Sequence, residues 1–296
     1  NDFASASESQ IRTAIAKLGQ VKDEILTNQI GIDKAINLYN NPGKSEIDKL
    51  IKNDIEKESS ESAIDDKNHV KEYLEGEIKK ADQVISDVNE QAYTTLGHED
   101  AYQKAYTDAK EILDNALSVA RKRIEKIDEA KTALENYQHN SENIIPSNIA
   151  EWTDPKYDDI KATLNKIKAA EDDKWLPISK LNLEDVNVED VKASTAKIIQ
   201  AYNDARLGKA KIDFNTEFNN IADVFTNPDS NAGSTNKYAT LRNKIIAEMQ
   251  PIKTEADAVN VDKTDTYQGA DPKVNKVNEL EQSLSQFKQK ANLAKE

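Results

Sequence analysis

Two long stretches of the chain carry apolar side chains at alternating intervals of three and four residues. Only Lys22 and Gln29 interrupt the first series with polar side chains, and only Lys131 interrupts the second. The two series are Ile11, Ile15, Leu18, Ile25, Ile32, Ile36 and Tyr39, and then Leu113, Leu117, Ala120, Ile124, Ile127 and Leu134. This spacing is typical of a coiled-coil seam, because it places the side chains along one face of a helix. The pattern therefore predicts two long helices, each with a buried apolar face.

Shorter runs of the chain follow the same helical spacing. They are Val70, Leu74, Ala81, Ile85 and Val88; Tyr157, Ile160, Leu164 and Ile167; and Val277, Leu280, Leu284, Phe287 and Ala291. The alternation of apolar and polar residues that marks a half-buried strand is almost absent. The sequence predicts an all-α fold.

Three clusters rich in Asn, Pro, Gly, Asp and Ser follow the aromatic residues Tyr39, Tyr137 and Phe225. The clusters read NNPGKSE, QHNSENIIPS and TNPDSNAGST. Proline cannot continue a helix, and Asn, Asp and Ser side chains bind their own backbone in turns. We expect a helix to end at each cluster.

An internal repeat relates the first two long stretches. Tyr39 and Tyr137 are 98 residues apart (137 − 39 = 98), and the related phrases DVNEQA and DVNVED hold Val88 and Val186 at the same offset (186 − 88 = 98). A third phrase, AVNVDK, contains Val259. The offset also places Ile15 over Leu113, Val21 over Val119, Leu26 over Ile124 and Ile36 over Leu134. We interpret these matches as diverged copies of one helical module, with the phrase at the junctions between copies.

The predicted modules are residues 1–98, 99–188 and 189–296, the last including a C-terminal helix. The return in the second module is expected to be irregular, because DDKWLPISKLNLEDVNVED contains a proline and has poor helical spacing. Three antiparallel helices per module would bury a narrow apolar stripe that a single helix cannot bury. Such tandem antiparallel coiled-coil or three-helix modules, joined by long helices, predict an elongated rod, which we expect to be a monomer.

Composition agrees with slender bundles and restricts the partners. Of the 296 residues, 32 % are charged, and the formal net charge of −14 opposes binding to nucleic acid or anionic lipid. The absence of cysteine excludes disulfides and thiolate metal sites but leaves the compartment open. No apolar run is long enough for a transmembrane segment. The start at Asn1, without Met or a signal sequence, suggests a processed or trimmed form.

Candidate catalytic and metal-binding residues are few. His69, His98 and His139 lie far apart in the sequence, without a second ligand at zinc spacing. The segment Asp229–Ser234 resembles a calcium loop but lacks the Glu that would close it, so a turn is expected. The acid pairs are Asp65 and Asp66, Asp158 and Asp159, and Asp172 and Asp173. We assign these pairs to solvated faces and helix starts, and predict neither an enzyme nor a cofactor nor a bound metal.

The two tryptophans are the strongest departure from this charged, alanine-rich pattern. Trp152 and Trp175 both lie in the irregular part of the second module, beside Pro155 and Pro177. Exposed tryptophans anchor partners in many interfaces, which makes this pair the candidate partner-binding residues. The alternative is that both fill the end of a helical bundle.

The composition, repeats and helical phrases of the chain resemble those of a known family. Phrases such as KIDEAKTALENY and KYDDIKATLNKIKAAE, the repeated modules and the single Met249 are similar to the helical-repeat surface adhesins of mycoplasmas and low-GC Gram-positive bacteria, in particular the variable adherence-associated antigens of mycoplasmas. The resemblance implies a non-enzymatic adhesin that attaches to a host-cell surface receptor or an extracellular matrix component. It also implies an extracellular location at the bacterial cell surface, anchored through a lipid-modified N-terminal segment that has been removed. The alternative is a helical spacer or an intracellular scaffold without its own ligand.

Overall fold

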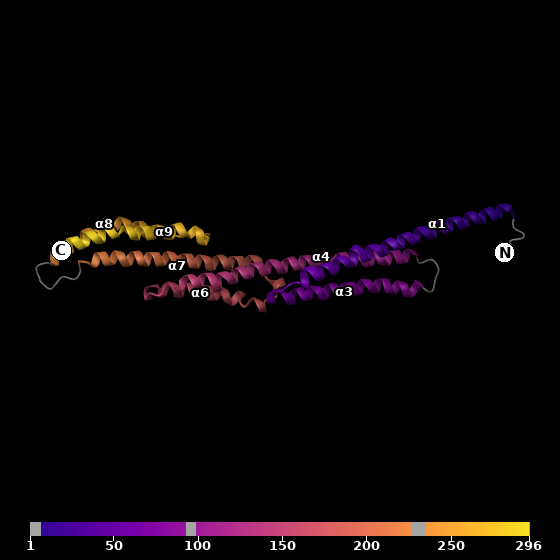
Figure 1. The fold of residues 1–296 in the computed structure, drawn as a ribbon, viewed down its shortest axis with the longest axis horizontal. Coiled ribbons are helices and arrows are strands. Elements are labelled where there is room, and N and C mark those ends of the chain that lie inside the picture. Colours follow the sequence, from indigo (N-terminus) through magenta and orange to yellow (C-terminus); the bar gives the residue numbers. More distant parts are fainter. Residues whose placement is uncertain (1–6, 93–98, 226–234, 296) are drawn as a thin grey trace. The chain divides into compact units, whose positions relative to one another are not determined.

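The computed structural model describes residues 7–92, 99–225 and 235–295, and within them every regular element is a helix (Figure 1). The α-helices are α1 (Glu8–Leu38), α2 (Ser45–Leu50), α3 (Glu61–Ala92), α4 (Glu99–Gln138), α5 (Ile145–Ile149), α6 (Asp158–Trp175), α7 (Val188–Asp223), α8 (Thr235–Ala258), α9 (Tyr267–Ser283) and α10 (Ser285–Lys295). π-Helical turns occur at Tyr39–Lys44, Ile51–Ile55 and His139–Ile144, and 3₁₀ turns at Pro155–Tyr157, Ile178–Lys180 and Leu183–Asp185. The prediction of an all-α fold is confirmed.

The chain divides into two compact units. Unit 1 comprises residues 1–131 and 179–186, and unit 2 comprises residues 132–178 and 187–296. The three modules and the rod expected from the repeat remain predictions.

Unit 1 is built where α3 and the first part of α4 pack together with the end of α1 and with α2. Its core contains Ala35, Tyr39, Ile47, Leu50, Ile51, Ile55, Ala63, Val70, Leu74, Ala81, Ile85, Ala105, Ala109, Leu113, Ala116, Ala120, Ile124, Ile127, Ala130 and Leu183. Tyr39 packs edge-on against Tyr106 at a ring-centroid distance of 5.8 Å, and the Arg123 guanidinium lies over the Tyr73 ring. These contacts cover α4 from two sides, as its apolar stripe requires.

A buried ionic cluster lies in the same unit. The Lys67 ammonium is 2.8 Å from Glu58 and 2.7 Å from Asp128, and Lys131 also binds Glu58. Burial acts to raise the pKa of Glu58, but the hydrogen bonds from Lys131 and Lys67 outweigh it and lower the pKa to about 2. Paired in this way, buried charges avoid the large desolvation cost of isolated ions.

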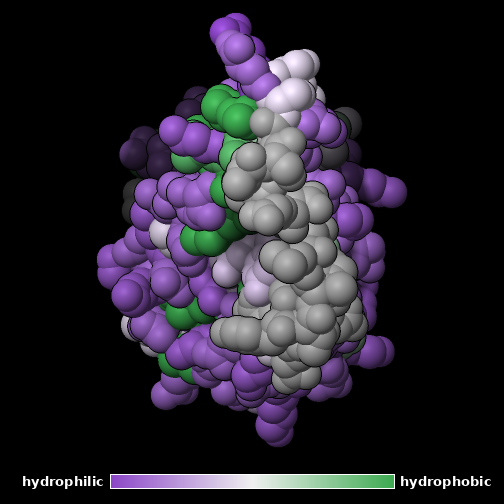
Figure 2. Space-filling view, turned by 90° about the vertical axis from the view of Figure 1, so that its right-hand side faces the viewer, coloured by the Kyte–Doolittle hydropathy of each residue, from purple (hydrophilic) through white to green (hydrophobic). Residues whose placement is uncertain are grey.

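The structure corrects the expectation that the whole α1 seam is buried. A capping box between Ser7 and Gln10 begins the helix, and its end is covered at Ala35 and Tyr39. Apolar side chains nearer the N-terminus are exposed to solvent instead, namely Ile11, Ile15, Leu18, Val21, Ile25, Leu26 and Ile30. Figure 2 looks at the molecule from the side of the N-terminus and shows apolar residues among the polar ones on that face. The spacing of the apolar residues predicted the helix, but these side chains are buried only where another element covers them.

The seam of α4 is close to the prediction. Ile124 is buried, and Lys122 and Glu125 are exposed, as expected. One position differs, because Ala116 is buried whereas Leu117 is only partly buried. The buried stripe therefore runs through Leu113, Ala116 and Ala120.

Unit 2 is organised around α7. Helix α6 packs along α7 from Ser194, which binds Glu171, to the vicinity of Gly208, and α8, α9 and α10 pack against the C-terminal half of α7. The core around the second half comprises Leu207, Ala210, Phe214, Phe218, Ile221, Phe225, Ile245, Met249, Ala256, Val274, Val277, Leu280, Leu284, Phe287 and Ala291. The predicted run from Val277 to Ala291 is therefore buried in full.

The repeated tyrosines make equivalent contacts at the ends of α1 and α4. The Tyr39 hydroxyl donates to Asp82 at 2.5 Å, and the Tyr137 hydroxyl donates to Asp172 at 2.7 Å. Burial and the neighbouring carboxylate raise the pKa of both tyrosines, so each remains a hydrogen-bond donor. The two tyrosines that the sequence repeat relates therefore make the same kind of hydrogen bond.

Helix α1 ends at Leu38 and α4 ends at Gln138, at the first two polar clusters, as expected. After Tyr39, only Asn41 leaves helical geometry within the π-helical turn that leads to α2. After Tyr137, π-helical backbone leads into α5, with Pro146 placed near the start of that helix, where proline is tolerated. The third cluster lies mainly in residues 226–234, outside the described residues, together with the turn expected at Asp229–Ser234.

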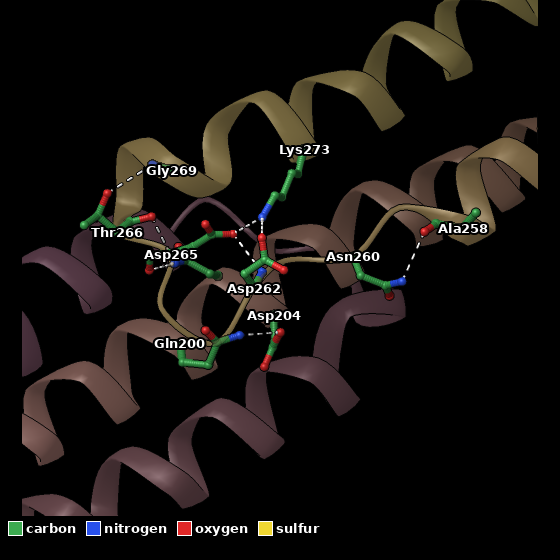
Figure 3. Close-up of polar contacts among 10 residues, drawn as sticks. Gln200, Asp204, Ala258, Asn260, Asp262, Asp265, Thr266, Gly269 and Lys273 are labelled. Atoms are coloured by element: carbon green, nitrogen blue, oxygen red, sulfur yellow. Dashed lines mark hydrogen bonds and ion pairs between the residues drawn. The ribbon is translucent and has the colours of Figure 1, made fainter.

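The valine-asparagine phrases lie at helix ends. Val88 is in the final part of α3, and Asn187 caps α7 by accepting a hydrogen bond from the Glu189 backbone N–H. At the third phrase, Asn260 donates to the Ala258 carbonyl in the connection between α8 and α9 (Figure 3). Each phrase therefore lies at or near the end of a helix, and its place between modules stays a prediction.

Candidate functional site

The connection between α8 and α9 holds a compact polar network (Figure 3). Lys273 bridges Asp262, at 2.6 Å, and Asp265, and Asp265 also accepts the Asp262 backbone N–H at 2.8 Å. Thr266 caps α9 by accepting from Gly269. Hydrogen bonds from Lys273 and the Asp262 backbone lower the pKa of Asp265. The charged and hydrogen-bonding groups of this network are paired with one another, so the network stabilises the loop.

Trp152 is buried inside unit 2. Only 7 % of it is exposed, and its ring stacks on Tyr202 at a centroid distance of 6.3 Å and an interplanar angle of 13°. Tyr202 in turn meets Tyr267 edge-on at 5.5 Å, and the Tyr267 hydroxyl donates to Asn140. This placement favours the packing interpretation of Trp152 over the partner-anchor interpretation.

Trp175 has a different environment at the end of α6. It is partly exposed, and its indole N–H donates to the Ser194 hydroxyl on α7 at 2.8 Å. Ser194 donates in turn to Glu171 at 2.6 Å. The chain of hydrogen bonds fixes the indole ring against α7 while part of it faces solvent.

A surface cavity of about 470 Å³ lies beside this ring. Its lining residues are Glu171, Lys174, Trp175, Asp190, Ala193, Ser194 and Lys197. Asn187 caps the start of α7. The first turns of α7, with Asp190, Ser194 and Lys197, lie beside the end of α6. The cavity is the candidate functional site.

Glu171 sets the electrostatics of the cavity. Its side chain is only 1 % exposed and lies 2.7 Å from the Lys174 ammonium, and Lys197 binds its second oxygen. Burial acts to raise the pKa of Glu171, but the hydrogen bonds from Lys174, Lys197 and Ser194 outweigh it and lower the pKa to about 2. The carboxylate therefore stays charged, and it holds two lysines and a serine in place around an aromatic surface.

Sequence reasoning found Trp175 but missed the residues around it. Glu171, Lys174 and Trp175 stand three and four positions apart, so helical spacing alone places them on one face of α6. Ser194 and Lys197 share a face of α7 in the same way. Which face of α6 meets which face of α7 depends on tertiary packing, and the sequence carries no local signal for that.

The acid pairs are only partly on solvated faces. Asp158 and Asp159 begin α6 as expected. Asp66, however, is buried and accepts the Leu183 backbone N–H at 2.8 Å, and Asp172 accepts from Tyr137, as described above. The expectation that the pairs lie on solvated faces or at helix starts was wrong for Asp66 and Asp172, because buried backbone and hydroxyl donors require acceptors.

The described part of the chain contains no group of three metal-ligating side chains, and His98 lies outside it. None of the described helices combines the length and hydropathy needed to span a bilayer.

Comparison with known proteins adds no relative: no family model, curated protein or solved structure matches this chain.

Proposed function

We propose that the chain is a non-enzymatic adhesin that binds a host-cell surface receptor or an extracellular matrix component through the Trp175 cavity. The observation that carries the proposal is a partly exposed tryptophan fixed at the rim of a cavity of about 470 Å³. Tryptophan supplies a large, rigid contact surface at low entropic cost, which is why it recurs at binding hot spots.

The charges around Trp175 support local recognition. The chain carries a formal net charge of −14, so it repels most cell-surface anions at long range. Lys174, Lys197 and Glu171 nevertheless place both signs of charge within the cavity. A partner would therefore be bound through short-range polar contacts and apolar contact with the indole, and its binding would depend only moderately on salt.

The same proposal places the protein at the outer surface of a bacterial cell. Labelling of intact cells with an antibody against the chain tests this location. Signal that appears only after the cells are permeabilised would favour the intracellular scaffold.

A helical spacer or scaffold is the second candidate. The observation that favours it is the length of α7, which runs unbroken for 36 residues and serves two sets of neighbours. Such a helix is suited to maintaining a fixed separation. A spacer without its own ligand would bind neither cells nor matrix proteins.

The deciding experiment measures saturable binding of the soluble chain to cultured host cells and to immobilised matrix proteins. Trp175→Ala should abolish most of the binding while the helical circular dichroism is retained. Lys166→Ala, on an exposed position of the same helix, is the matched control and should bind like the parent chain. Equal binding by the two variants would remove the cavity from the mechanism, and no binding by the parent chain would end the adhesin proposal.

A further inference from the structure

The cavity beside Trp175 has an inner layer of polar groups that are engaged with one another. Lys197 binds one carboxylate oxygen of Glu171. The other oxygen accepts hydrogen bonds from Lys174 and Ser194. The Ser194 hydroxyl also accepts the indole N–H of Trp175, so it acts as donor and acceptor at once. Glu171 and Ser194 therefore hold the cavity in shape, and a ligand must use the other groups of the lining.

The accessible polar groups of the lining include two ammonium groups and one carboxylate. The side chains of Lys174 and Lys197 are 53 and 59 % exposed, and each ammonium has donors beyond the one that binds Glu171. Asp190 is exposed on α7 and lines the same cavity. A ligand in the cavity therefore meets hydrogen-bond donors from the lysines and hydrogen-bond acceptors from Asp190.

The charges that line the cavity cancel. Lys174 and Lys197 contribute two positive charges, and Glu171 and Asp190 contribute two negative charges. A ligand charge of either sign would find as many like charges as opposite ones, so it would gain no net attraction in return for its desolvation. A hydroxyl group is better suited to this lining, because it accepts from an ammonium and donates to a carboxylate.

The Trp175 ring adds a flat apolar surface to these polar groups. Its indole is fixed by the hydrogen bond to Ser194 at 2.8 Å, and it lines the same cavity as the lysines. A sugar ring has a face made largely of C–H groups and a rim of hydroxyls, so it can pack on the indole while its rim forms hydrogen bonds. We propose that the cavity binds a neutral sugar ring of a host-surface glycan, an inference that rests on the function proposed above and names the chemistry of the receptor.

The surroundings of the cavity favour a sugar over a peptide. Peptides commonly bind by adding a strand to a sheet edge, by laying a helix in a long apolar groove, or by docking a proline-rich segment between aromatic side chains. The described residues contain no strand. The cavity lining lies within residues 171–175 and 190–197 and contains one aromatic side chain and one alanine. A compact polyol fits this short, mainly polar lining better than an extended peptide does.

Saturation-transfer difference NMR on the full chain tests the ligand class directly. The probes are the methyl glycosides of glucose, galactose, mannose and N-acetylglucosamine. At least one should bind with a dissociation constant of about 1 mM, with the strongest transfer at the protons of one ring face. The uronic acid and the amino sugar of the same stereochemistry place a charge on the same ring and should bind at least threefold more weakly.

Three variants connect the binding to the cavity. Trp175→Ala should abolish the transfer, and Asp190→Asn, which keeps the shape of the side chain, should weaken binding at least threefold. Lys166→Ala is the matched control on α6 and should bind like the parent chain. Circular dichroism verifies that each variant is folded. Absence of binding by every neutral glycoside, tighter binding of the uronic acid or the amino sugar, or unchanged binding by folded Trp175→Ala would overturn the inference.

Binding to cultured host cells separates this inference from the adhesin proposal. The glycoside that binds best should compete with the cells, and periodate oxidation of the cell-surface glycans should reduce cell binding at least fivefold. Saturable cell binding that neither treatment reduces would overturn the sugar ligand and leave the adhesin in place. Glycoside binding through Trp175 without any binding to cells or matrix proteins would support the sugar site and end the adhesin proposal.

Discussion

Replacement of Glu171 by glutamine should destabilise unit 2 at neutral pH but not at low pH. The substitution keeps the shape of the side chain and removes the charge that Lys174, Lys197 and Ser194 stabilise. The amide still accepts one hydrogen bond, so the loss reports mainly on the charge.

The magnitude follows from the pKa of Glu171, which is lowered from 4.5 to about 2. One pKa unit corresponds to about 1.4 kcal/mol, so the shift represents on the order of 3 kcal/mol. The side chains of Lys174 and Lys197 are 53 and 59 % exposed, and solvent screens their charges. We therefore expect Glu171→Gln to lower the free energy of unfolding by about 2 kcal/mol at pH 7.

The sign of the pH dependence follows from the lowered pKa. Because the folded state binds the proton more weakly than the unfolded state, the stabilisation is complete above about pH 5 and is lost as the pH falls towards 2. The difference between the parent chain and Glu171→Gln should therefore shrink over this interval and approach zero near its acid end.

Urea denaturation followed by tryptophan fluorescence measures this difference, because both tryptophans belong to unit 2. Glu189→Gln is the control, since Glu189 forms an exposed ion pair with Lys192, and it should change the free energy of unfolding by less than about 0.5 kcal/mol. A Glu171→Gln difference that stays the same from pH 7 to pH 2.5 would refute the electrostatic account.

Three further comparisons between variants test the packing. Ile124→Ala in the α4 seam should cost about 2 to 3 kcal/mol of stability and the partly buried Leu117→Ala about 1 kcal/mol, whereas Lys122→Ala should cost almost nothing, as measured by denaturation followed by circular dichroism. Tyr137→Phe removes a hydrogen bond to a carboxylate and should cost about 1.5 to 3 kcal/mol, but Tyr39→Phe should cost less because Asp82 is half exposed; equal losses in thermal denaturation would contradict this order. Phe214→Ala empties a fully buried site beside Phe218 and should cost about 3 to 5 kcal/mol in urea denaturation, well above the cost of Phe218→Leu.

The sequence predicted helices well because their signal is local. The 4-3 spacing around Ile124, and the run from Val277 to Ala291, appear in the structure as buried stripes. The same signal failed for Ile15 and Leu18, because a stripe states which face is apolar and not whether another element covers it. Leu117 shows a smaller version of this limit, since Ala116 and Leu117 are adjacent candidates and packing selects between them.

The candidate site was predictable only in part. Trp175 was conspicuous by its rarity, and the irregular backbone after it was indicated by Pro177 and the absence of helical spacing. The role of Glu171 was hidden, because a glutamate in a charged helix is ordinarily solvated. Its burial results from the docking of α6 against α7 at Ser194, a contact between residues 23 positions apart.

The unbroken path of α7 has a mechanical consequence for unit 2. It is held by α6 from Ser194 to the vicinity of Gly208 and by α8, α9 and α10 along its C-terminal half, and the helix is continuous between them. A tensile load applied to one end would pass along the backbone hydrogen bonds of a single helix instead of extending a flexible joint. Rupture of either set of contacts would then remove support from the other, so unit 2 should yield to force in one step.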